Sequence, residues 1–279
     1  MRYRLLRFVP AALVCVALSG QPQEPRFEVA SIKPGTPLNQ PGRFESVRGG
    51  PGTTDPGMFT CRNCSLAGLI SQAYGPLQFG QFVPLQWLGT ARFDIAAKVP
   101  AGASREQFRI MLRNLLIERF KVAVHRDLRP LSVYELTVAK DGPKFQATAA
   151  NNDEPPDMDD VGRPKVALDG SFVLPRGIQD MFGMVGEVGH GEINLEGKPI
   201  SQLTAILAVQ YRMPVLDKTG LAGTYDIKLS VKWEGRDLDA RQASLQEALR
   251  SQLGLLLHQN KGAVSVLIVD RAEKVPVEN

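Results

Sequence analysis

The chain has 279 residues, of which 43% are hydrophobic and 22% are charged, a composition that predicts a globular protein with one moderate core or two small ones. Without Arg2, Arg4 and Arg7 of a predicted leader, 30 basic residues stand against 29 acidic residues. This balance, with no basic stripe interleaved with aromatic residues, argues against nucleic acid as a partner.

The first twenty residues are typical of a secretory signal peptide. Three arginines precede an apolar run from Phe8 to Leu18, and Ser19 and Gly20 are small residues suited to cleavage. A helix needs about twenty residues to cross a ~30 Å hydrocarbon core, so this run of eleven is too short for a permanent membrane span. Cys15 is a weak lipidation candidate, because Val14 stands where lipoprotein signals usually have a small residue. We therefore expect a secreted or periplasmic protein.

The first half of the mature chain predicts two helices and several strands. Apolar residues at helical spacing predict a helix over 66–74 and a second one over 104–120, and 133–138 alternates as a strand does. The Gly- and Pro-rich stretch 34–57 is expected to be irregular. Residues 149–164 carry many acidic residues and few apolar ones, which predicts a linker or an exposed loop.

The second half is easier to interpret. Ile193 and Leu195 predict a strand, Ser201 can cap a helix that ends before Pro214, and a short strand follows. Tyr225 begins a strand with plain alternation. Ser244 and Glu247 have capping-box spacing and predict the start of another helix, which Gly254 ends. Two further strands, 255–258 and 264–270, are expected to form a hairpin across a turn at 260–262.

The two halves match each other, which indicates a duplication. Residues 66–74 match residues 203–211 at a shift of 137 positions, 93–95 match 225–227 at a shift of 132, and 112–133 match 245–266 at a shift of 133, so the shift is nearly constant. The sequence thus predicts an α+β fold of two tandem diverged repeats, each ordered strand, helix, strand, strand, helix, strand, strand. The predicted regions are a signal peptide (1–20), a first repeat with an irregular N-terminal segment (21–148), an acidic linker (149–170) and a second repeat (171–279).

Four segments carry a resemblance to a known family. They are Phe-Glu-Val-Ala-Ser-Ile-Lys-Pro at 27–34, Phe-Asp-Ile at 93–95, Pro-Val-Leu-Asp-Lys-Thr-Gly-Leu at 214–221, and the ending Pro-Val-Glu-Asn. Together they resemble an uncharacterised family of exported soil-bacterial proteins, a domain of unknown function. The resemblance brings no catalytic residue or cofactor, and it implies extracytoplasmic sensing. Each half is also weakly similar in element order to the short N-terminal domain of secretins and TonB-dependent receptors, a likeness that does not determine function.

Cys61 and Cys64 form the one redox-type motif, expected at the start of the first helix. A structural disulfide is the favoured interpretation, because an exported chain meets an oxidising environment. Free thiols, a redox site with a thiol pKa lowered by a helix N-terminus, and half of a metal site are the alternatives. No cofactor and no metal site are predicted.

Histidines and aspartates supply the other candidates. His125 and His258 occupy equivalent positions and are expected to be structural or surface residues, and His190 is expected to be solvated in a loop. Asp94 and Asp226 are expected at strand surfaces or as turn partners, with a carboxylate pair for acid–base chemistry as the alternative.

These observations lead to two hypotheses for function. The first is a non-catalytic binding or sensing module of the cell envelope that takes a protein or peptide partner by strand addition. The second is an extracytoplasmic enzyme, either a thiol–disulfide catalyst at Cys61 and Cys64 or a hydrolase. Accessible sulfurs at a cleft would favour the catalyst, and buried ones would favour a structural pair. The sequence does not predict the oligomeric state.

Overall fold

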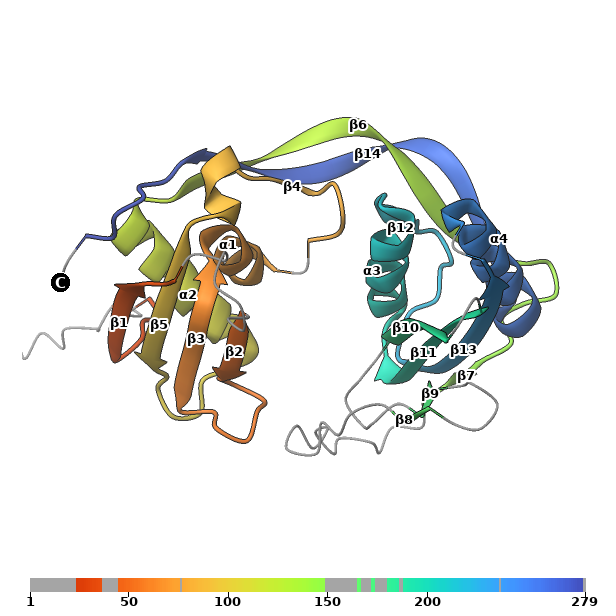
Figure 1. Ribbon diagram of the computed structural model, residues 1–279, viewed down its shortest axis with the longest axis horizontal. Coiled ribbons are helices and arrows are strands. Elements are labelled where there is room, and N and C mark those ends of the chain that lie inside the picture. The colour runs from red at the N-terminus through yellow and green to blue at the C-terminus, as the bar shows by residue number, and fades with distance from the viewer. Residues whose placement is uncertain are drawn as a thin grey trace, which may run out of the picture.

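The computed structural model confirms an α+β fold (Figure 1). Its described residues form two lobes, each a four-stranded antiparallel sheet with two helices, and a long two-stranded ribbon joins them. None of the helices in this part of the chain combines the length and the apolar character that crossing a bilayer requires. The structure describes residues 24–36, 45–75, 77–148, 165–166, 172–173, 180–185, 188–235 and 237–277.

The first lobe is a sheet with strand order β1-β5-β3-β2 and a layer of helices on one face. Alternation in β5 produces this arrangement, since Phe93 and Ile95 are buried beneath the helices whereas Asp94 and Lys98 are exposed on the open face. The predicted helices of this half are confirmed. The elements are β1 (Val29–Pro34), β2 (Ser46–Gly49), β3 (Met58–Ser65), α1 (Leu66–Tyr74), β5 (Arg92–Lys98) and α2 (Arg105–Phe120), with a short 3₁₀ turn η1 (Gln86–Gly89) before β5.

The second lobe has the strand order β10-β11-β13-β7 and a core of its own. The predicted strand from Tyr225 is confirmed, and Gly254 ends the last helix as expected; its conformation there is left-handed. The elements are β7 (Gln146–Ala147), β10 (Asp180–Val185), β11 (Val188–Lys198), α3 (Ile200–Tyr211), β13 (Tyr225–Glu234), and α4 (Leu238–Ala248) with a π-helical turn η3 (Leu249–Leu253), beside a separate pair β8 (Lys165–Val166) and β9 (Phe172–Val173).

Two predicted helix starts are wrong. Helix α3 begins at Ile200 after Pro199, so Ser201 lies inside its first turn. Helix α4 begins at Leu238, because Asp237 accepts a hydrogen bond from the backbone N–H of Asp239 and caps the helix seven residues before the expected cap, Ser244. Ser244 is therefore an interior helical residue. A capping signature predicts a helix start only where no better cap precedes it.

The ribbon consists of β6 (Ala123–Val138) and β14 (Leu255–Arg271), paired antiparallel along their whole length. The predicted hairpin between 255–258 and 264–270 is wrong, since β14 is one continuous strand. Gly262 pairs with Leu131 instead of forming a turn, and a Cβ atom there would come within 2.9 Å of the Leu216 side chain and 3.1 Å of the Val133 side chain. The glycine thus permits close packing within a strand.

Each lobe receives part of its core from the other half of the sequence. Leu136 of β6 is buried in the second lobe, and Leu267 and Val269 of β14 are buried in the first. Two short strands extend the ribbon on its flanks in the order β12-β6-β14-β4: β12 (Val215–Asp217) beside β6 and β4 (Phe82–Val83) beside β14, both parallel. Strands from both halves are therefore needed to complete either lobe.

Corresponding strands occupy corresponding places in the two sheets. The orders β1-β5-β3-β2 and β7-β13-β11-β10 agree strand for strand. Phe82 of β4 pairs with Leu267 of β14, and the residues that lie 133 positions from each of them, Val215 of β12 and Tyr134 of β6, also pair with each other. This is the arrangement that a duplication predicts. The duplication itself and the domain boundaries drawn from the sequence stay predictions.

One side chain connects the lobes directly. Gln78 lies on the connection between α1 and β4, and its Nε2 atom donates to Thr204 Oγ1 of α3 at 3.2 Å. Its Oε1 atom accepts from the backbone N–H of Val215 in β12 at 2.8 Å. Since Thr204 and Val215 are both buried, Gln78 holds the first lobe against the second through one amide group.

Candidate functional site

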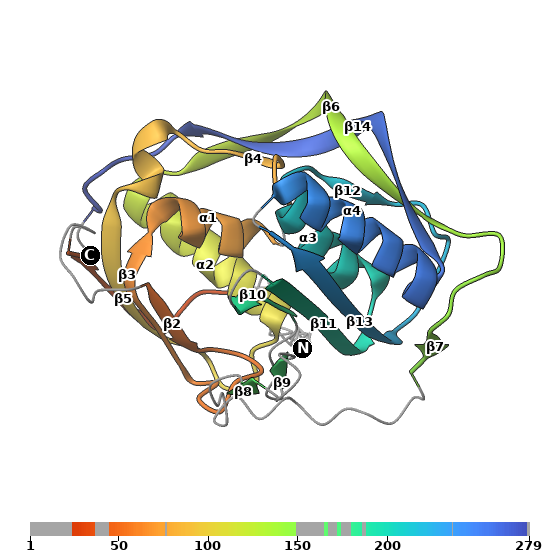
Figure 2. The ribbon, with the colours of Figure 1, turned by 45° about the vertical axis from the view of Figure 1, so that its right-hand side comes forward.

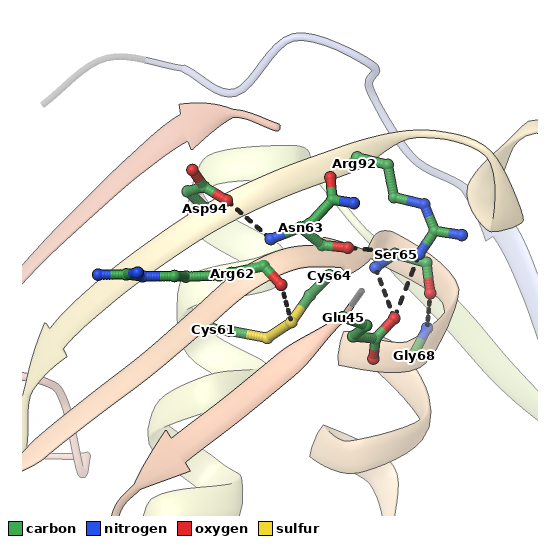
Figure 3. Close-up of polar contacts among 9 residues, drawn as sticks. All are labelled: Glu45, Cys61, Arg62, Asn63, Cys64, Ser65, Gly68, Arg92 and Asp94. Carbon is green, nitrogen blue, oxygen red and sulfur yellow. Dashed lines mark hydrogen bonds and ion pairs between the residues drawn. A yellow bond between two sulfur atoms is a disulfide. The ribbon is translucent and has the colours of Figure 1, made fainter. Parts of the chain in front are cut away.

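Cys61 and Cys64 lie in β3 rather than at the helix start, since Ser65 is the N-cap of α1. Cys61 pairs with Ile95 and Cys64 with Phe93, so the strand bulges between them opposite Asp94. Both cysteines point into the core, each 1% exposed, and a disulfide joins them with their Cα atoms 5.9 Å apart (Figure 3). The sulfurs are therefore held inside the lobe, away from its surface.

Asn63 and Asp94 fix the bulge. Asn63 has a left-handed conformation (φ 54°), which asparagine tolerates better than most residues. Its backbone N–H donates to Asp94 Oδ1 at 2.7 Å (Figure 3). The Asn63 side chain is 6% exposed, and neither of its polar atoms has a hydrogen-bond partner among the described residues. Asp94 thus serves as a backbone partner within its own lobe.

Asp226 does the same in the second lobe. Its Oδ1 atom accepts from the backbone N–H of Gly197 at 2.8 Å and from Thr148 Oγ1 at 2.9 Å, at an irregularity of β11. Asp94 and Asp226 therefore lie in different sheets, each bound to its own bulge. The structure does not bring them together as a carboxylate pair.

The histidines are dispersed. His125 Nδ1 lies 2.8 Å from Asp270 Oδ1 on the exposed side of the ribbon, and His258 is exposed on the opposite strand. The prediction for His190 is wrong: it lies in β11, is 4% exposed, and its Nε2 atom is 3.0 Å from Glu192 Oε1. It is buried because β11 extends back to Val188 and pairs with β13 there. In the described part of the chain no three His, Cys, Asp or Glu residues could hold a metal ion.

Glu45 connects the bulge region to the edge of the sheet. Its Oε2 atom accepts from Arg92 Nη1 at 3.2 Å and from the backbone N–H of Ser65 at 3.4 Å (Figure 3). Ser65 Oγ accepts in turn from the N–H of Gly68 at the start of α1. Because Glu45 directly precedes β2, these contacts hold the start of β2 beside the first turn of α1.

A groove of about 1250 Å³ opens between β2, the loop that follows it, α1 and α2. It is larger than the ~300–1,000 Å³ typical of small-molecule sites, so it can take a segment of chain. One wall is formed by Gly68, Ser71 and Gln72 of α1 and by Gly75 directly after it, and at Gly75 no atom lies within 4 Å of the place that a Cβ atom would take. The other lining residues are Glu45, Val47 to Asp55 of β2 and its loop, Thr60, Leu77, Arg105, Phe108 and Arg109.

Among the residues that the structure describes, no strand pairs with the outer edge of β2, which borders this groove. Strand β2 is an outer strand of the sheet, on the side that faces the second lobe (Figures 1 and 2). The N–H of Gly50 donates to Met58 O, so by antiparallel alternation Arg48 and Ser46 also bond to β3. Val47 lies between them, and its N–H and C=O therefore point away from the sheet. Its side chain is 46% exposed.

A family model described as "Protein of unknown function (DUF3738)" matches residues 67–272, a span that contains the ribbon, the second lobe and the part of the first lobe from α1 onward, whereas β1, β2 and β3 precede it. The chain belongs to this family. Its resemblance to a domain of unknown function is thereby confirmed, whereas export, a soil-bacterial origin and the likeness to secretin domains stay predictions. No curated protein and no solved structure matches the chain.

The disulfide gives the first testable prediction. Replacing both cysteines with alanine should lower the free energy of unfolding by about 2 kcal/mol, the loop-entropy value for so short a ring. Urea denaturation measures this change in the free energy of unfolding. The control is the double variant in reducing buffer, because a reductant should lower the denaturation midpoint of the parent protein and leave that of the variant unchanged. An unchanged midpoint of the reduced parent protein would contradict a stabilising disulfide.

Proposed function

We propose that the mature chain is an exported, non-catalytic binding module of the cell envelope, which takes an extended segment of a protein or peptide as an added strand along β2. The observation that carries this proposal is the outward-pointing main chain of Val47 at the groove. An unpaired strand edge is a template for another strand, and main-chain hydrogen bonds supply affinity in such complexes.

The surroundings of β2 suit an added strand. Alternate side chains of a bound strand would point toward α1, where Gly75 leaves room for them, since no atom lies within 4 Å of its Cβ position. Val47 and Phe108 supply apolar contacts nearby. The contacts of Glu45 hold the edge strand and the helix in place before a ligand arrives, which reduces the ordering cost of binding.

The enzyme hypothesis has weaker support. A thiol–disulfide catalyst must expose a sulfur to its substrate, because exchange proceeds by attack of a thiolate on an accessible disulfide. Cys61 and Cys64 are each 1% exposed and point into the core of the first lobe. Their burial favours the structural interpretation and leaves the strand edge as the better candidate for function.

Val47→Pro is the sharpest test. Proline removes the outward N–H of β2 but none of the hydrogen bonds to β3, so the fold should persist. The probes are dodecapeptides selected on residues 21–279 from a random phage-displayed library. An unpaired acceptor costs about 1–3 kcal/mol, so we expect the dissociation constants, measured by fluorescence anisotropy, to rise about tenfold or more.

Val47→Thr is the matched control, because it keeps the N–H and the β-branched side chain; it should bind like the parent protein. Hydrogen exchange supplies a second readout, since the amide of Val47 should gain protection when peptide is added. Unchanged affinity of the Val47→Pro variant, with no protection at Val47, would refute strand addition at β2.

A further inference from the structure

We propose that the segment bound along β2 carries a carboxylate, which Arg48 and Arg105 receive at the groove. This inference rests on the proposed function and specifies the chemical class of its partner. It depends on which charged groups of the groove are already paired and which are not.

Two of the five charged side chains that line the groove have partners. Glu45 is paired with Arg92 at 3.2 Å, and Arg109 is paired with Glu106 at 3.4 Å. Arg48, Arg105 and Asp55 form no ion pair within the part of the chain that the structure describes. The groove therefore offers two unpaired guanidinium groups against one carboxylate, a surplus of positive charge.

Arg105 is positioned by the loop after β2. A Cβ atom at Gly52 would lie 2.5–2.9 Å from the guanidinium atoms of Arg105, so this group lies against the bare backbone of the loop. Gly52 also has a φ of +84°, a conformation that side chains rarely adopt. Glycine at this position thus allows the guanidinium group to rest on the groove wall.

Arg48 is adjacent to the strand edge. Arg48 follows Val47 directly in β2, the short strand that would pair with the ligand, and it lines the groove. Guanidinium groups bind carboxylates through two parallel N–H···O bonds, a geometry that fixes orientation as well as charge. A carboxylate on the added strand would therefore favour one register along β2.

The experiment uses the strongest peptide from the library in three synthetic forms: the parent, a form with its Asp and Glu replaced by Asn and Gln, and a form with an amidated C-terminus. The protein variants are Arg48→Gln and Arg105→Gln. Arg250→Gln is the control, because Arg250 is exposed on the second lobe and the substitution changes the net charge equally.

We expect each groove variant to weaken binding of the parent peptide about three- to tenfold, as for partly exposed ion pairs, and the control to leave it unchanged. Loss of binding on replacing Asp and Glu places the carboxylate on a side chain, and loss on amidation places it at the C-terminus. In either case the peptide that lacks the carboxylate should bind the arginine variants and the parent protein with the same affinity, which is the result that a double-mutant cycle gives for a direct contact. Added salt should weaken binding of the parent peptide more than binding of the peptide that lacks the carboxylate.

The two proposals fail in different ways. In one outcome, Val47→Pro abolishes binding while the arginine variants and the uncharged peptides bind like their parents. That result would contradict the proposed carboxylate and support strand addition at β2. If the arginine variants weaken binding and Val47→Pro does not, strand addition is wrong. A library without binders refutes both, and self-association that Val47→Pro abolishes would assign the edge to a second copy of the chain.

Discussion

Replacing Leu267 with alanine is expected to destabilise the first lobe, although Leu267 belongs to the last strand of the chain. Its side chain is fully buried among the residues of that lobe, beside the segment of β4. Truncation of a buried leucine removes apolar contacts and leaves a cavity, which costs about 2–5 kcal/mol. This is the largest stability effect that we predict.

Leu136→Ala is the matched substitution in the other direction. Leu136 is equally buried and comes from β6, yet it packs in the second lobe. Trp87 packs against the first core and Trp233 lies in the second, so variants that keep a single tryptophan report on each lobe separately. Fluorescence during urea denaturation should show the Trp87 midpoint fall for Leu267→Ala and the Trp233 midpoint fall for Leu136→Ala. The reverse assignment would contradict the crossed packing.

Gln78→Ala is expected to release the two lobes from each other. The substitution removes both hydrogen bonds of the amide and leaves the buried N–H of Val215 without its acceptor, at a cost of about 1–3 kcal/mol. The ribbon would then be the main connection between the lobes. We therefore expect a broader distribution of distances between spin labels placed on the two lobes.

Gln259→Ala controls for the loss of a glutamine, because Gln259 is an exposed residue of β14 and β6 lies between it and Val215. Its distance distribution should match that of the parent protein. A Gln78→Ala variant with an equally narrow distribution would mean that the packing beneath the ribbon alone fixes the lobes.

The sequence predicted best those elements that depend on local signals. Helix α1 begins and ends where its apolar spacing indicates, and α2 begins after Ser104, whose capping box is present with both of its hydrogen bonds. Strand β13 alternates so plainly that its buried and exposed faces could be assigned directly. In each case the residues that decide the structure are close neighbours in the chain.

The elements that it missed depend on distant residues. Gly262 was interpreted as a turn, because the closeness of Leu216 and Val133 that requires a glycine cannot be deduced from neighbouring residues. Strand β2 escaped prediction because four residues in a Gly- and Pro-rich stretch show no clear alternation. The groove was missed for the same reason, and that Arg48 and Arg105 line one groove becomes visible only when β2 is placed beside α1 and α2.

The crossed ribbon has a consequence for how the chain reaches its native state. Since β14 spans residues 255–271 and completes the first core, the N-terminal lobe cannot close while the polypeptide is still emerging from the ribosome. A product that stops short of β14 would keep its apolar surfaces open in both lobes and would be recognised by proteases. Maturation is thereby tied to synthesis of the full length of the chain.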